Sequence, residues 1–163
     1  MRVWILALAL LVSSCGFQLR GTANLPFDTL YIPNTTGGIA LELKRNIQAG
    51  SRTVVVADPK FAQALLELSG ETRLRNILSL SGAGRVRELQ LIYRVNLRVH
   101  DGKGAEFLPL TTLSIVRDLS YNDTDVLSKE AEEASINREV QADLVQQILR
   151  RLSGATPAKT AAQ

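Results

Sequence analysis

The sequence predicts an α+β fold in which two helices pack on one face of a mixed, mainly antiparallel sheet of four to five strands. Three observations support this class. Residues 85–100 alternate apolar and polar side chains, as in an antiparallel strand with one buried and one solvated face. Residues 38–49 and residues 125–152 each repeat apolar side chains at spacings of three and four, as amphipathic helices do. The expected elements run β-α-β-β-β-β-α along the chain.

The first third of the chain predicts two short strands around one helix. Residues 29–32 are rich in β-forming side chains, and Pro33 ends that strand. Helix 38–49 follows, with Gly50 in the expected position of a C-terminal cap. Its buried face is expected to carry Ile39, Leu43 and Ile47. Residues 52–57 hold three consecutive valines, which predicts a buried second strand.

The next segment predicts a helical turn, a strand and a loop. Asp58 and Pro59 are typical of a helix start, because an Asp can cap the chain and Pro fits the first helical position. Residues 64–72 alternate in polarity and predict a strand that can extend through Arg75. Residues 78–84 are mostly small and predict a connecting loop.

The strand at 85–100 is the clearest element of the sequence. Its buried face is expected to carry Leu89, Leu91, Tyr93, Val95, Leu97 and Val99, and its polar face Gln90, Arg94, Asn96, Arg98 and His100. Ile92 is the one apolar side chain among the polar positions from 90 to 100. Residues 101–104 form a turn, and residues 106–118 return as the hairpin partner.

The last predicted helix, 125–152, is long enough to cross the whole sheet. Its first half is rich in acidic side chains, and Arg150 and Arg151 close it, a polarity that suits the helix dipole. Residues 153–163 offer little to bury and predict a disordered tail.

The N-terminal residues predict export from the cytoplasm. Arg2 precedes an apolar run from Val3 to Val12, which is too short to span a bilayer but has the layout of an export signal. Val12-Ser13-Ser14-Cys15 resembles the lipobox of bacterial lipoproteins. That resemblance implies cleavage after residue 14, three acyl chains on Cys15 and firm membrane attachment. Two alternatives are a buried cytosolic segment with Cys15 in the core, and an ordinary secretory signal with an incidental cysteine.

The predicted organisation is a signal peptide at 1–14, a single periplasmic α+β domain at 15–152 and a tail at 153–163. Gly16 follows the cysteine where an Asp would, in enteric lipoproteins, favour the inner membrane. The sequence therefore predicts a lipid-anchored protein on the periplasmic side of the outer membrane.

The charge balance argues against nucleic acid as a partner. The chain has 19 Lys and Arg against 16 Asp and Glu, which becomes 18 against 16 once Arg2 leaves with the signal peptide, and a net charge of +2 is no nucleic-acid footprint. Arginine dominates the cations, and its planar fork of donors suits phosphate. Arg73, Arg75, Arg85 and Arg87 flank the predicted loop, so a hairpin there would gather them into an anionic head-group site. The alternative is that they are solvated arginines at strand ends.

No residue pattern points to catalysis, to a cofactor or to a metal. His100, the only histidine, closes a strand, with neither a serine elbow nor metal-ligand spacing beside it. Glu130, Glu132 and Glu133 could pair as acid and base, but their place early in a helix explains them. The glycines at 82–84 precede a strand, whereas a dinucleotide-binding loop precedes a helix. The sequence predicts a protein that is not an enzyme.

Five blocks in order along the chain resemble the LptE family of LPS-assembly lipoproteins. They are Cys15-Gly16-Phe17-Gln18-Leu19-Arg20-Gly21, residues 84–95, residues 117–122, residues 126–133 and residues 147–152. The resemblance implies a non-enzymatic protein that plugs the outer-membrane barrel LptD, helps it fold and contacts lipopolysaccharide (LPS).

The resemblance also implies one LPS contact, at Lys129. Its alternative is an ion pair within the helix, with Glu132 or Glu133. Arg85 and Arg87 join Lys129 as predicted LPS contacts by inference from their charge. The sequence departs from the family at Leu89, often Tyr, and at Ser128, often Ala, which puts a contact in doubt but not the membership.

Two rival functions remain open at this point. One is an auxiliary outer-membrane lipoprotein of a periplasm-spanning ABC lipid transporter, which is also a small α+β domain on a lipidated cysteine. The other is a lipid-anchored hydrolase, for which the sequence supplies no paired nucleophile and base.

Overall fold

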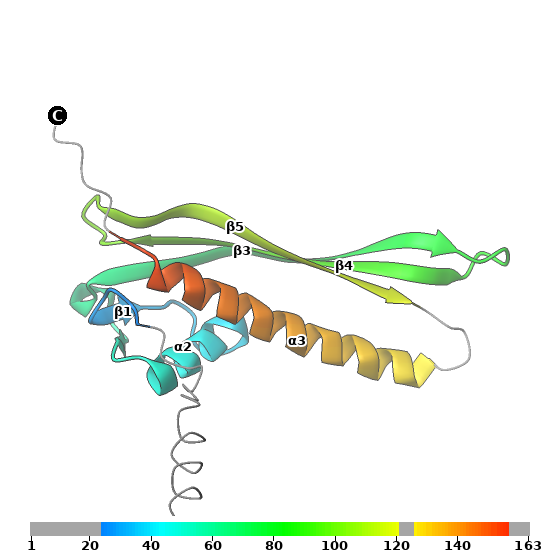
Figure 1. The fold of residues 1–163 in the computed structure, drawn as a ribbon, viewed down its shortest axis with the longest axis horizontal. Coiled ribbons are helices and arrows are strands. Elements are labelled where there is room, and N and C mark those ends of the chain that lie inside the picture. The colour runs from blue at the N-terminus through cyan, green and yellow to red at the C-terminus, as the bar shows by residue number, and fades with distance from the viewer. Residues whose placement is uncertain (1–23, 121–125, 157–163) are drawn as a thin grey trace, which may run out of the picture.

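The computed structural model describes residues 24–120 and 126–156. In chain order the elements are β1 (Thr29–Tyr31), α2 (Gly38–Gly50), β2 (Val54–Val56), the 3-10 turn η1 (Pro59–Phe61), β3 (Ala64–Leu80), β4 (Val86–His100), β5 (Glu106–Ser120) and α3 (Val126–Ser153). The sheet order is β2-β1-β3-β4-β5. β1 runs parallel to β2 and β3, whereas the β3/β4 and β4/β5 pairs are antiparallel. Both helices lie on one face of this sheet (Figure 1), which confirms the predicted fold class.

The segment around α2 matches the prediction except at its cap and its second strand. Ile39, Leu43 and Ile47 are buried, as the helical spacing predicts. Gly50 is still helical, and Ser51 caps the helix instead, because its backbone N–H and its hydroxyl both donate to the Ile47 carbonyl at 2.9 Å. The predicted burial of β2 is wrong at Val54, which is 60% exposed, because β2 is an edge strand of the sheet.

The helix start predicted at Asp58 is confirmed as a single 3-10 turn. The Asp58 side chain accepts a hydrogen bond from the Lys60 N–H at 2.9 Å, and Pro59 is the first residue of the turn. The turn ends at Phe61, so the chain is free to enter β3.

The hydrophobic core lies between α2, α3 and the helix-facing side of β4. The six alternate β4 residues predicted as buried are all buried, from Leu89 to Val99. On α3 the apolar stripe contributes Val140, Leu144, Ile148 and Leu152 to the same core. Ala155 is also buried, so the packed domain continues past residue 152, where the tail was expected to begin; residues 157–163 lie outside the described part.

The connection between β3 and β4 is shorter than the sequence predicts. A loop was expected at 78–84, but β3 continues to Leu80 and pairs there with Val86. The reason is that pairing with β4 holds residues 76–80 in the sheet, which their local sequence, interrupted by Ser79, does not reveal. The long β3–β4 hairpin projects past the first turn of α3, at the opposite end of the molecule from β1 and α2 (Figure 1).

A β-bulge at Gly70 changes which β3 side chains face the helices. Ser69 pairs with Asn96 and Thr72 with Arg94, so β3 has one extra residue against β4. Gly70 has φ +61°, the left-handed region that glycine adopts most readily. Because side chains alternate along a strand, one extra residue moves the following odd-numbered side chains to the helix-facing side.

Candidate functional site

Of the two interpretations of the four arginines beside the β3–β4 loop, the structure does not support the one in which they gather. Arg73 and Arg75 lie opposite Tyr93 and Leu91, well back along the hairpin, because β3 extends to Leu80. The extension of β3 to Leu80 explains both this separation and the shorter loop, because each residue added to a strand moves the turn by about 3.3 Å.

Arg73 and Arg75 have partners within the domain. The Arg73 guanidinium lies 5.9 Å from the centre of the Tyr93 ring and 3.2 Å from the Glu71 carboxylate. The Arg75 guanidinium forms an ion pair with Glu133 of α3. The Arg75–Glu133 pair ties the middle of the hairpin to α3, whereas the Arg73 contacts stay within the hairpin. We therefore assign both arginines a structural role.

Arg85 and Arg87 occupy the tip of the hairpin, where a hydrogen-bonded turn positions them. The Ser81 N–H donates to the Arg85 carbonyl at 2.7 Å, and the Arg85 N–H donates to the Ser81 hydroxyl at 3.1 Å. The Gly84 N–H donates to the Ser81 carbonyl at 2.9 Å. Both arginine side chains are exposed. The turn thus holds two exposed arginines at fixed positions of a constrained backbone.

Lys129 belongs to the first turns of α3, which begins at Val126. Figure 1 shows the start of α3 at the same end of the molecule as the β3–β4 turn. The Arg75–Glu133 ion pair also joins the early part of α3 to this hairpin. The side chain of Lys129 lies outside the described part of the structure. The backbone therefore brings the three predicted cationic residues to one end of the molecule.

Sequence reasoning missed the apolar side chains at the same tip. Ile77, Leu78 and Leu80 are 58%, 50% and 56% exposed. They were assigned mainly to a small-residue loop, because Ser79 and Ser81 interrupt them. The available signal was their size: three large aliphatic residues within four positions are unusual in a solvated loop.

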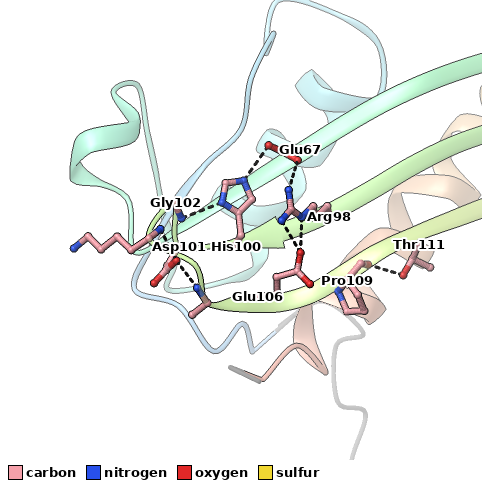
Figure 2. Close-up of polar contacts among 10 residues, drawn as sticks. Glu67, Arg98, His100, Asp101, Gly102, Glu106, Pro109 and Thr111 are labelled. Atoms are coloured by element: carbon pink, nitrogen blue, oxygen red, sulfur yellow. Dashed lines mark hydrogen bonds and ion pairs between the residues drawn. The ribbon is translucent and has the colours of Figure 1, made fainter. Parts of the chain in front are cut away.

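A polar network occupies the opposite end of the hairpin, around the β4–β5 turn (Figure 2). Nε2 of His100 lies 3.0 Å from a Glu67 carboxylate oxygen, and Nδ1 accepts from the Gly102 N–H at 2.9 Å. Arg98 pairs with Glu106 at 2.6 Å and with Glu67 at 3.6 Å. Hydrogen bonding to Glu106 raises the pKa of Arg98 above its usual range. One ring nitrogen of His100 thus contacts the neighbouring strand β3, and the other holds the β4–β5 turn.

Asp101 closes the β4–β5 turn. Its carboxylate accepts hydrogen bonds from the Lys103 N–H at 2.7 Å and the Ala105 N–H at 2.9 Å. These bonds, with that from Lys103 the strongest, hold the pKa of Asp101 below its usual value. The turn is therefore closed by the ionised form of this side chain.

Polar contacts also fix α3 to the other layers. The Tyr93 hydroxyl donates to the Asn137 side chain, and burial raises the pKa of Tyr93. Arg117 of β5 pairs with Asp143 at 2.7 Å, and the Gln141 amide donates to Glu42 of α2 at 2.9 Å. α3 thereby becomes the element to which the sheet and α2 are both attached.

The predicted lipidation site, Cys15, lies outside the described residues. Within the part that the structure describes, no helix is both long and apolar enough to cross a membrane.

The fold and its two ends define a class: a small α+β domain whose long hairpin carries exposed basic and apolar side chains away from a helix-covered core. A family model named LptE, described as lipopolysaccharide-assembly, matches residues 27–152. Because this match covers most of the chain, the protein belongs to the LptE family. The resemblance drawn from the five sequence blocks is confirmed. A comparison with curated proteins finds no match.

Solved structures with the same fold are lipoproteins by their names. An uncharacterized lipoprotein B from Nitrosomonas europaea is 39% identical, with a TM-score of 0.72, over 85% of this chain and 90% of that one. A minor lipoprotein from Acinetobacter baumannii is 25% identical, with a TM-score of 0.65, over 83% and 98%. The rare lipoprotein B from Shewanella oneidensis, 21% identical with a TM-score of 0.61 over 77% and 93%, shares the fold.

Proposed function

We propose that this protein is a non-enzymatic outer-membrane lipoprotein that is anchored through Cys15, plugs an LptD-type β-barrel and helps it assemble. In this function it binds LPS through Arg85, Arg87 and Lys129 during transport of LPS to the cell surface. Membership of a lipopolysaccharide-assembly family over residues 27–152 is the observation that carries the proposal.

The arrangement of the cationic residues supports the LPS contact. Arg85 and Arg87 are exposed on a constrained turn, and the first turns of α3, which include Lys129, lie at the same end of the molecule. Arginine can hold a phosphate through two parallel hydrogen bonds, and LPS carries phosphates on its lipid portion. Three cations at one end suit a ligand with more than one phosphate.

The elongated shape supports the plug. α2, α3 and the short strands cover only one part of the β3–β4 hairpin, so the molecule is a rod rather than a sphere (Figure 1). A rod of this kind can lie along the axis of a barrel with its hairpin end deep in the lumen and its α2 end towards the periplasm.

LPS binding is tested by charge reversal in the mature protein. We expect Arg85→Glu/Arg87→Glu and Lys129→Glu each to weaken LPS binding about tenfold or more, since each removes a charge-assisted contact. The matched control is Arg45→Glu/Arg52→Glu, which reverses two exposed arginines in and just after α2. Unchanged LPS affinity in both tip variants would contradict the assigned contacts.

Barrel association is tested by affinity purification in mild detergent from the native host. We expect a large β-barrel to copurify, with the charge-reversal variants as well as with the wild type. Recovery of an ABC transporter complex in its place would favour the rival function. Intact mass analysis of the same sample should show a chain that begins at Cys15 and carries fatty acids; a chain without them would contradict the anchor.

A further inference from the structure

The tip of the β3–β4 hairpin carries aliphatic side chains that the fold does not need. Ile77, Leu78 and Leu80 are each at least half exposed, and none of them belongs to the hydrophobic core. Hairpin ends in water normally carry polar residues, since exposed aliphatic groups there favour association. A cluster of exposed aliphatic side chains at such a position indicates a binding surface for an apolar ligand or partner.

The three side chains lie on an irregular stretch of β3. Ile77 pairs with Leu89, on the helix-facing side, whereas Ser79 pairs with Glu88 and Leu80 with Val86. The register shift before Ser79 leaves Leu78 outside the pairing as a bulge residue, and the shift after Ser79 does the same for Arg87 on β4. Two irregularities within four residues break the alternation that would keep apolar groups on one side. An irregular set of exposed aliphatic groups on a narrow ribbon suits flexible chains better than the flat, rigid surface of a protein.

The positive charge of the tip limits the class of ligand further. Residues 76–87 contain Arg85 and Arg87 and no acidic residue. Glu88, the next residue, accepts a hydrogen bond from the Ser79 hydroxyl at 2.9 Å across the hairpin. Cationic groups directly beside exposed aliphatic groups fit an anionic amphiphile, with its phosphate on the arginines and its acyl chains on the leucines and isoleucine.

We propose that the tip of the β3–β4 hairpin binds the fatty acyl chains of LPS, through Ile77, Leu78 and Leu80, while Arg85 and Arg87 bind its phosphates. This inference rests on the proposed function and adds to it, because it assigns the lipid portion of LPS, and not only its charge, to the hairpin. The hairpin then has to discriminate an acylated ligand from its deacylated form.

The experiment compares two probes: intact LPS and the same LPS after chemical removal of its acyl chains. We expect the wild-type protein to bind intact LPS about tenfold more tightly than deacylated LPS. Leu78→Gln/Leu80→Gln should lose most of the preference for intact LPS while binding the deacylated form at the wild-type affinity, because Ile77 and the phosphate contacts remain. Arg85→Glu/Arg87→Glu should weaken the binding of both probes.

The matched control is Leu110→Gln/Val116→Gln, which replaces two exposed apolar residues on β5, 67% and 46% exposed. It should retain the wild-type preference for intact LPS. Circular dichroism and thermal melting establish that each variant is folded before binding is measured. If Leu78→Gln/Leu80→Gln keeps the full preference for intact LPS, the acyl contact is overturned while LPS binding stands. If the wild type binds neither probe, the proposed LPS contact itself is wrong.

Discussion

The two ends of the β3–β4 hairpin differ in what surrounds the strands. At the α2 end, Leu66, Leu97 and Val99 are buried beneath the helices. Towards the tip, every side chain from residue 69 to residue 78 on β3 is exposed. The same pair of strands is thus a core element at one end and a projecting ribbon at the other. Stability is concentrated at the covered end, which leaves the ribbon free to carry binding residues at little cost to folding.

The bulge at Gly70 marks the boundary between these two regions. Before it, Leu66 and Leu68 face the helices; after it, Arg73 and Arg75 do. The change places two arginines on the helix-facing side of β3. Arg73 pairs there with Glu71, and Arg75 pairs with Glu133 of α3. One extra residue in β3 therefore converts an apolar face into a polar one within a single strand.

The largest expected difference in the free energy of unfolding is between the same Leu→Ala substitution made at the two ends of the hairpin. Leu97 of β4 has no exposed surface, whereas Leu80 of β3 is 56% exposed. We expect Leu97→Ala to lower the free energy of unfolding by about 2–5 kcal/mol, because it leaves a cavity in the core. Leu80→Ala should change it by less than about 0.5 kcal/mol. Urea unfolding followed by circular dichroism measures both; similar losses would contradict the division of the hairpin into core and ribbon.

A smaller effect is expected at the boundary itself. A Cβ at Gly70 would lie 2.7 Å from the Asn96 side-chain nitrogen, and the residue would have to keep φ +61°. Asn96 is held by a 2.7 Å hydrogen bond from the Thr112 hydroxyl, so it cannot move away without losing that bond. We expect Gly70→Ala to cost about 1–2 kcal/mol of unfolding free energy.

The control for this prediction is Gly82→Ala at the tip. Gly82 has no atom within 4 Å of an added Cβ, and its φ is not in the left-handed region. We expect Gly82→Ala to leave the free energy of unfolding unchanged. An equally harmless Gly70→Ala would show that β3 tolerates a different register, and that the bulge does not fix the boundary.

The covered end was largely predictable from sequence, and the ribbon was not. Alternation in β4 and the apolar stripe of α3 identify buried side chains because each pattern is local and its burial is one-sided. The bulge at Gly70 and the true end of β3 depend on pairing with β4, which no local pattern records. The interpretation in which the four arginines gather is wrong for this reason, whereas the positions of Arg85 and Arg87 beside the turn followed from chain order alone.

The smallest expected effect is a difference between the two turns in how the stability of their variants depends on pH. Asp101 closes the β4–β5 turn as a carboxylate, and backbone hydrogen bonds, first from Lys103, hold its pKa below 3.8, its ordinary value. A lowered pKa in the folded state stabilises that state above the unfolded-state pKa, and this stabilisation is lost as the pH falls through the folded-state pKa. Asp101→Asn should therefore be less stable than the wild type at pH 7, and the difference should shrink below about pH 4.

The β3–β4 turn provides the matched case, because a hydroxyl that does not titrate closes it. The Ser81 hydroxyl accepts from the Arg85 N–H at 3.1 Å. We expect the loss of stability in Ser81→Ala to be the same at pH 7 and at pH 3, as measured by urea unfolding at both values. An acid-dependent difference for Ser81→Ala, or a constant one for Asp101→Asn, would contradict the assignment of charge to one turn alone. The contrast matters for function, because the turn beside Arg85 and Arg87 is then closed without a titrating group, whereas the β4–β5 turn depends on an ionised carboxylate.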